Sequence, residues 1–200
     1  MKKIQSKLLS LAILGLATFT FGQQVQFGVK AGGGLSNTTV AHGISKERIG
    51  MLAGGVVKYQ LRDRVEDQYV QAEILYTNQG EYSVDHAGNK YKAYINYINI
   101  PIMYKYYFDD QGKDFFLEAG PQIGFKVSDN FDPAGPEYSN HKLKSFDLAI
   151  NAGVGFSLDR KYELNLRYGY GLVDTLDFNR WDNGNNRTSY LSLAFTYLFD

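Results

Sequence analysis

The sequence predicts an all-β fold, an eight-stranded antiparallel up-and-down transmembrane β-barrel, from three observations. Apolar and polar residues alternate in eight segments of about ten residues or more, as in strands that face lipid on one side. The connections between these segments alternate between long and short along the chain. Glycine (21), tyrosine (16) and phenylalanine (13) are plentiful and proline (4) is scarce, which favours strands and turns over helices.

Residues 1–22 are typical of a secretory signal peptide that is removed during export. Three lysines and no acidic residue precede an apolar run over residues 8–21. A membrane-anchoring helix is the alternative, but this run is shorter than the roughly 20 apolar residues that a spanning helix needs. We therefore expect cleavage after Gly22 and an outer-membrane β-barrel domain over residues 23–200, located in the outer membrane of a Gram-negative cell.

The composition excludes several classes of function. The sequence has no cysteine, so disulfides, thiolate metal sites and a cysteine nucleophile are excluded. Removing residues 1–22 leaves 18 basic and 21 acidic residues, a net charge of about −3, which does not attract nucleic acid. We expect a monomer without a cofactor, surrounded by outer-membrane lipid, with a protein partner at the loops as a further candidate.

The first four strands are expected at 24–35, 51–61, 70–77 and 94–108. Long polar loops at 37–48 and 78–93 alternate with a short charged link at 62–68. Polar residues or glycines separate the apolar positions within each strand. These apolar positions are Val25, Phe27, Val29, Ala31 and Leu35; Met51, Ala53, Val57, Tyr59 and Leu61; Val70, Ala72, Ile74 and Tyr76; and Ile98, Ile100, Ile102, Tyr104, Tyr106 and Phe108.

The last four strands are expected at 114–127, 146–157, 162–172 and 188–200. Tight turns at 109–113 and 159–161 alternate with long loops at 128–144 and 173–187. The final strand carries an aromatic residue next to its end, as outer-membrane assembly requires. The apolar positions are Phe115, Leu117, Ala119, Ile123, Phe125 and Val127; Phe146, Leu148, Ile150, Ala152, Val154 and Phe156; Tyr162, Leu164, Leu166, Tyr168, Tyr170 and Leu172; and Leu191, Leu193, Phe195, Tyr197 and Phe199.

This order places every long loop at one end of the barrel. Outer-membrane barrels have the same arrangement, with long loops outside and short turns in the periplasm. Two prolines conflict with a continuous ladder, because Pro101 and Pro121 lie inside expected strands and have no N–H to donate. The turn between their strands brings them to nearly the same height, so we expect irregular pairing there.

The polar face of the strands is expected to line the lumen. An eight-stranded interior is only wide enough for side chains that pack and pair, whereas open pores need about sixteen strands. The apolar face carries almost no charge and has aromatic residues at both strand ends, as a lipid-facing surface requires. A lipocalin, with its apolar face inside, is the alternative. The expected polar network of the lumen comprises Lys30, Lys58, Glu73, Lys105, Glu118, Lys126, Asp147, Glu163 and Arg167.

Four short motifs connect these strands to a known family: AEILY at 72–76 with QG at 79–80, YINIP at 97–101, EAGPQIGF at 118–125, and LRYGYG at 166–171. Together they resemble the PorT-like family of outer-membrane β-barrel proteins over the whole mature chain. The resemblance implies an outer-membrane barrel and, through the founding member of the family, a link to protein secretion. Asn99 departs from the family pattern, which has an acidic residue there.

The three histidines, His42, His86 and His141, fall in expected long loops. Asp85 precedes His86 and serines lie near His42, so a Ser/His/Asp arrangement in a PagP-like acyltransferase, or a metal site, is one interpretation. The other is that solvated loops carry polar residues. No two histidines have ligand spacing and no nucleophile motif surrounds a serine, so we expect no catalytic, cofactor-binding or metal-binding residues.

Trp181, in the loop 173–187, is the candidate contact for a partner, because exposed aromatic residues are enriched in interfaces. Packing against neighbouring loops is the alternative. The sequence thus favours a barrel with a plugged lumen that acts as a structural or interaction component through its loops. A narrow conduit for small or apolar solutes, opening sideways into the lipid, is the first alternative, and a loop-borne lipid-modifying enzyme is the second.

Overall fold

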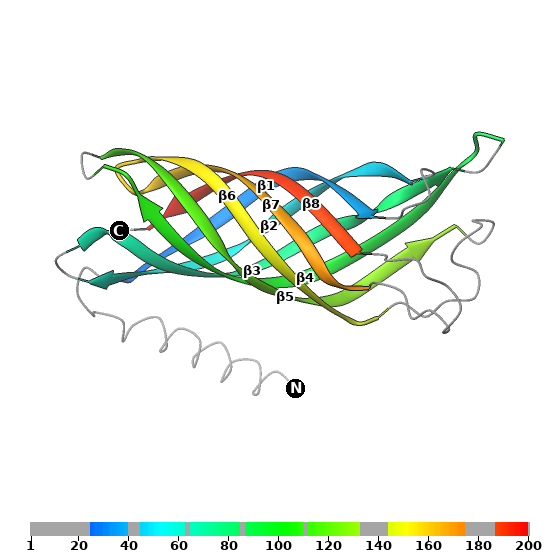
Figure 1. The fold of residues 1–200 in the computed structure, drawn as a ribbon, viewed down its shortest axis with the longest axis horizontal. Helices are drawn as coiled ribbons and strands as arrows, with labels where there is room; N and C mark the ends of the chain where they lie inside the picture. The colour runs from blue at the N-terminus through cyan, green and yellow to red at the C-terminus, as the bar shows by residue number, and fades with distance from the viewer. Residues whose placement is uncertain are drawn as a thin grey trace, which may run out of the picture.

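The computed structural model describes residues 25–39, 45–62, 65–84, 87–109, 112–132, 144–174 and 187–199. Within these ranges, eight antiparallel strands pair in chain order and β8 pairs with β1, which closes the barrel (Figure 1). This confirms the predicted fold class. The expected signal peptide lies outside the described residues. The strands are β1 (Val25–Thr39), β2 (Ser45–Arg62), β3 (Val65–Val84), β4 (Lys90–Tyr107), β5 (Lys113–Phe131), β6 (Phe146–Leu158), β7 (Tyr162–Asp174) and β8 (Arg187–Leu198).

Short connections gather at one end of the barrel, where β1 begins and β8 ends (Figure 1). The tightest joins β6 to β7, with positive φ at both central residues, Asp159 (52°) and Arg160 (49°). Lys161 N–H donates to the Leu158 carbonyl at 3.0 Å and closes this turn. Two successive left-handed residues are the geometry that matches the twist of paired strands. Among the described residues, no helix has the length and hydropathy needed to cross a bilayer.

Two hairpins at the opposite end are longer than predicted. The sequence predicts irregular loops at 37–48 and 78–93, but β1 and β2 enclose only residues 40–44, and β3 and β4 only residues 85–89. In Figure 1 the hairpin of β3 and β4 projects beyond the other strands. The loop prediction is wrong here because these strand extensions are largely polar, so no apolar alternation marks them as strands.

The prolines interrupt the ladder, as predicted. Between β4 and β5, Pro101 pairs with Gln122 and the next pair is Tyr104 with Ala119, in unchanged register. The missing pairs lie beside Pro121, whose nitrogen has no hydrogen to donate. A similar gap interrupts the pairing of β4 with β3 beside Pro101. The barrel thus accommodates both prolines with non-bonded positions and without a bulge at either one.

Alternation along the strands puts apolar side chains outside and polar side chains inside. On β7, for example, Leu164 and Leu166 are 48% and 45% exposed, while Asn165 between them is 2% exposed. The same pattern along the strands exposes most of the large hydrophobic side chains and buries charged side chains such as Lys58 and Glu73. The lipocalin alternative is therefore wrong for this chain.

The outer surface also shows where the hydrocarbon layer ends on the loop side. Asn78 donates to Asn96 at 2.7 Å, and Asn96 donates to Ser128 at 2.9 Å, forming a polar belt across β3, β4 and β5. The next outward-facing residue of β4 towards the short turns is Ile98. From there to Phe108, just past the end of β4, every outward-facing residue is apolar or aromatic. The ten steps from Ile98 to Phe108 rise about 33 Å along the strand, or about 25 Å at a tilt near 40°, which is the height of an outer-membrane apolar band.

Candidate functional site in the lumen

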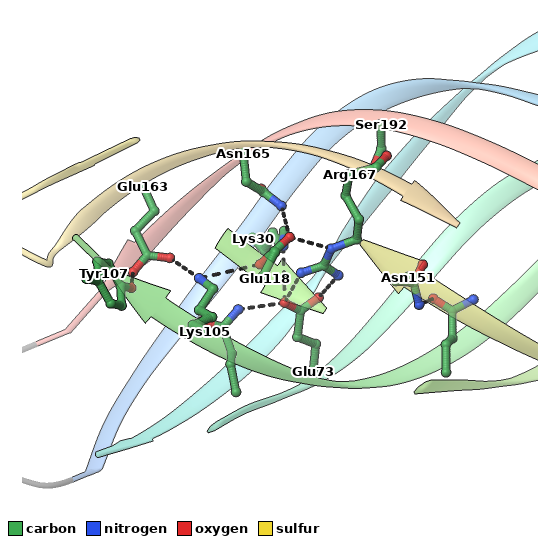
Figure 2. Close-up of polar contacts among 12 residues, drawn as sticks. Lys30, Glu73, Lys105, Tyr107, Glu118, Asn151, Glu163, Asn165, Arg167 and Ser192 are labelled. Carbon is green, nitrogen blue, oxygen red and sulfur yellow. Dashed lines mark hydrogen bonds and ion pairs between the residues drawn. The ribbon is translucent and has the colours of Figure 1, made fainter. Parts of the chain in front are cut away.

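Arg167 of β7 lies at the centre of the lumen and joins two carboxylates (Figure 2). Its Nη1 and Nη2 each donate to Glu73 at 2.8 Å, and its Nε donates to Glu118 at 2.7 Å. Lys30 Nζ lies 3.1 Å from Glu73 Oε1, and Asn165 donates to Glu118 Oε1 at 2.7 Å. The planar guanidinium suits this arrangement, because it can donate in parallel to one carboxylate while contacting another.

Glu163 forms a second centre closer to the short turns. Its Oε1 accepts hydrogen bonds from Lys58 at 2.9 Å and from the Tyr107 hydroxyl at 2.5 Å, and its Oε2 pairs with Lys105. Lys105 Nζ also lies 3.8 Å from Glu118 Oε2, which connects the two centres. These groups come from inward positions of four strands, β2, β4, β5 and β7, so the contacts cross the barrel.

We call the seven paired charges the central network. Each is at most 5% exposed, and four cations face three anions. Removing an ion from water costs several kcal/mol, which is offset only when partners are close and well oriented. The network therefore depends on every member. Its residues are Lys30, Lys58, Glu73, Lys105, Glu118, Glu163 and Arg167.

Aromatic rings close the turn-side end of the lumen. The ring centroid of Tyr107 lies 5.3 Å from that of Tyr69 and 5.2 Å from that of Phe116, and all three are buried. Arg160 reaches over them from the β6–β7 turn, with its guanidinium carbon 4.6 Å from the Tyr107 ring centroid and its Nε 2.9 Å from Asp114 Oδ2. These three rings with Arg160 form the aromatic cap.

The loop-side half of the lumen is built differently. Asp147 accepts a hydrogen bond from Thr188 at 2.9 Å, and among the described residues it pairs with no cation. Asn99 donates to Thr77 at 2.8 Å. Between this half and Arg167 lies a cavity of about 20 Å³, roughly the space for one water molecule.

The structure places the nine predicted lumen residues in two groups. Seven form the central network, whereas Lys126 pairs with Asp129 at 2.5 Å near the loop-side mouth and Asp147 stands apart from the network. The aromatic cap was not predicted from the sequence. Tyr107 and Phe116 occupy inward positions by strand parity, so their burial could have been predicted. No sequence pattern indicates that Arg160, a turn residue, reaches over the end of the lumen.

The three histidines and Trp181 lie outside the described residues. Within the described ranges, no three His, Cys, Asp or Glu side chains converge as ligands of a metal ion would. The catalytic and partner-binding interpretations of these loops therefore stay predictions.

A hollow of about 690 Å³ lies on the outer, lipid-facing surface. Its floor is Ala119 beside Ala152, and in the same row Tyr104 and Tyr168 stand on either side of the two alanines. Glu118, a member of the central network, also contributes to its lining. The hollow adjoins the interrupted pairing of β4 with β5, so outer surface and lumen come close together at this place.

The sequence matches the family described as outer membrane protein beta-barrel domain over residues 21–177. No curated protein matches it. Among solved structures, the chain resembles OprG from Pseudomonas aeruginosa, with TM-score 0.53 and 15% identity over 89% of this chain and 98% of that one. It also resembles Neisserial surface protein A, with TM-score 0.50 and 18% identity over 88% of this chain and 100% of that one. At these identities the likeness shows the fold alone. The family match, which covers most of the chain, shows that the protein belongs to the outer membrane protein beta-barrel domain family, and the outer membrane is its location.

Proposed function

We propose that this protein is a closed, monomeric barrel that acts as a structural and interaction component at the cell surface. The observation that carries the proposal is the central network, which fills the lumen with buried, paired charges. A passing ion or polar solute would have to separate these pairs, and breaking one buried pair costs about 3 to 5 kcal/mol. The side chains in the lumen therefore stabilise the barrel wall, and the interaction with a partner takes place at the loop-side end of the barrel.

The two long hairpins, β1 with β2 and β3 with β4, form this surface. β1 with β2 and β3 with β4 continue as paired strands past the polar belt that marks the edge of the hydrocarbon layer. A surface carried on paired strands is better ordered than one carried on loops alone, which favours recognition of a protein partner. The PorT-like resemblance makes a component of a secretion system the partner that we propose first.

Capture from native outer membranes tests this proposal. The full protein and a variant with residues 81–93 replaced by Asn-Gly are each purified in mild detergent, since Gly80 and Tyr94 are paired and a two-residue turn can join them. A second variant shortens the other hairpin in the same way, by replacing residues 37–47 between the paired Ser36 and Arg48. We expect a stoichiometric companion that at least one shortened variant loses while its heat-dependent gel mobility stays normal. Companions unchanged in both variants would contradict the proposal, and so would discrete conductance steps from the intact protein in single-channel recordings.

A narrow conduit that opens sideways is the second candidate, favoured by the hollow beside the interrupted ladder. Tyr104 and Ala119 are directly opposed next to this gap, and the chain has no cysteine of its own, so replacing both with cysteine would lock the seam between β4 and β5. If small apolar solutes pass there, their entry into vesicles should fall on oxidation and recover on reduction. Equal entry in both states would exclude this route.

We also propose that the protein is not an enzyme. Outer-membrane lipid profiles are then expected to be identical with the protein, without it, and with alanine at His42, His86 and His141. A lipid species that disappears in the triple variant would overturn this and would favour the loop-borne, lipid-modifying activity.

A further inference from the structure

Four basic residues gather on the projecting parts of β2 and β4, on either side of β3, and we call them the basic patch: Lys46, Arg48, Lys90 and Lys92. Lys46 is opposite Tyr82, and Tyr82 is opposite Lys92, so the three side chains share one face of the sheet. That face is the outer one, because burial alternates along β4 and the intervening Ala93 is buried at 1% exposure. The patch therefore points sideways, away from the barrel axis.

Arg48 is held in place at the lower edge of the patch. Its guanidinium carbon lies 3.7 Å from the centroid of the Tyr94 ring, and its Nη1 donates to the Gln79 carbonyl. Tyr94 in turn donates its hydroxyl hydrogen to Tyr82 at 2.5 Å. Cation–π stacking and these hydrogen bonds fix the guanidinium before any ligand arrives, which reduces the entropy lost on binding.

Among the described residues, two exposed acidic residues lie beside the patch. They are Asp132, whose backbone N–H donates to the Lys92 carbonyl, and Glu47, between Lys46 and Arg48. Glu47 and Glu81 face each other across β2 and β3, and Glu81 is fully buried on the inner side. Among the described residues no ion pair involves any of the three lysines of the patch. Positive charge is thus concentrated here on a chain whose overall charge is near neutral.

The height of the patch restricts what it can bind. Tyr94, against whose ring Arg48 stacks, lies four residues beyond Ile98. At a tilt near 40° this is about 10 Å above the edge of the hydrocarbon layer. Lys92 lies about 15 Å above the same edge. The polar zone of an ordinary bilayer is only about 5 to 8 Å deep on each side. A membrane ligand of this patch must carry its negative charge above that zone.

We infer that the basic patch binds the phosphorylated sugar headgroup of a glycolipid in the outer leaflet. Such a lipid is anchored beside the barrel wall, extends above the ordinary headgroup zone and presents phosphate oxygens as acceptors. The planar guanidinium of Arg48 and the ammonium groups of Lys46 and Lys92 are hydrogen-bond donors suited to phosphate oxygens. The inference does not depend on the function proposed for the hairpins.

Nanodiscs of phosphatidylcholine doped with lipopolysaccharide that carries phosphates on its core sugars, above the acylated disaccharide, provide the test. Lipid retained by the purified full protein is counted by native mass spectrometry for the wild type and for the double variant Lys46→Gln, Lys92→Gln. Because each lysine near a charged surface adds roughly fivefold in affinity, we expect the double variant to bind roughly thirty-fold more weakly. The control double variant Lys113→Gln, Lys161→Gln removes equal charge at the short-turn end and is expected to bind like the wild type.

Three outcomes would overturn the inference, provided that heat-dependent gel mobility shows every variant to be folded. They are equal retention of the same lipopolysaccharide without its core phosphates, equal retention of phosphatidylglycerol, and equal weakening in the control variant. The conservative variant Lys46→Arg, Lys92→Arg is expected to keep the binding. Added salt should weaken the wild type more than the Gln variant, because the contacts are exposed.

Discussion

The two halves of the lumen pair their buried polar side chains in different ways. The half near the short turns buries seven charges that pair with one another, four cations with three anions, under the aromatic cap. The half near the loops uses neutral hydrogen bonds such as that from Asn99 to Thr77, and one of its carboxylates, Asp147, is bound by a hydroxyl. Losing a partner costs about 3 to 5 kcal/mol for a buried charge and about 1 to 3 kcal/mol for a buried neutral group. Stability should therefore be concentrated in the turn-side half.

The strongest test removes a member of the central network. Glu163→Ala leaves Lys58 and Lys105 facing each other without their shared carboxylate, and it also removes the acceptor of Tyr107. We expect the free energy of unfolding in lipid vesicles to fall by about 3 to 5 kcal/mol. Urea titration followed by the gel shift of the folded barrel measures it. A loss below about 1 kcal/mol would remove the contrast between the two halves.

The geometry of the network, as distinct from its charge, is tested by Arg167→Lys. Lysine keeps the charge but cannot contact Glu73 and Glu118 with the same set of donors, so we expect a loss of about 1.5 to 3 kcal/mol by the same titration. Arg187→Lys is the matched control, because Arg187 is about one-third exposed and lies 3.8 Å from Asp174. There we expect less than about 1 kcal/mol. Equal losses at the two sites would mean that charge alone matters.

Packing under the aromatic cap is tested by Gly155→Ala. A Cβ at Gly155 would lie 2.2 Å from the Phe116 ring, so the ring must move, and we expect a loss of about 1 to 3 kcal/mol. The control Gly33→Ala adds the same methyl group on the outer surface, where the nearest atom, the Gly50 carbonyl oxygen, is 3.5 Å away. Its stability should stay within about 0.5 kcal/mol of the wild type. An unchanged Gly155→Ala barrel would show that the cap is loosely packed.

The smallest effect is expected in the loop-side half, from Asp147→Asn. The amide keeps the shape and the bond to Thr188, and it removes a buried charge that pairs with no cation among the described residues. The free energy of unfolding should change by less than about 1 kcal/mol, in either direction. A loss as large as that of Glu163→Ala would show that both halves depend on charge, which would end the comparison.

Most of the correct predictions came from strand parity, the alternation of inward and outward residues along a strand. It placed residues such as Lys105 and Glu163 inside and the leucines of β7 outside, because a period of two leaves no other choice for a half-buried strand. Parity cannot say which inward residues meet. Arg167 and Glu73 are 94 residues apart, and their contact depends on the stagger of the strands around the closed barrel. Arg160 was missed because a turn has no such period. The hairpin extensions were missed because their residues are largely polar, so no apolar alternation marks them as strands.

The pairing of β1 with β8 has a consequence for biogenesis. β1 is synthesised first and β8 last, yet they join along their length, from Gly28 with Leu198 to Thr39 with Arg187. Each unpaired peptide group left in hydrocarbon costs several kcal/mol, so neither edge is tolerated there alone. The nascent chain must therefore be kept out of the lipid until its last strand has been delivered, and a chain that stops before β8 has no stable inserted state.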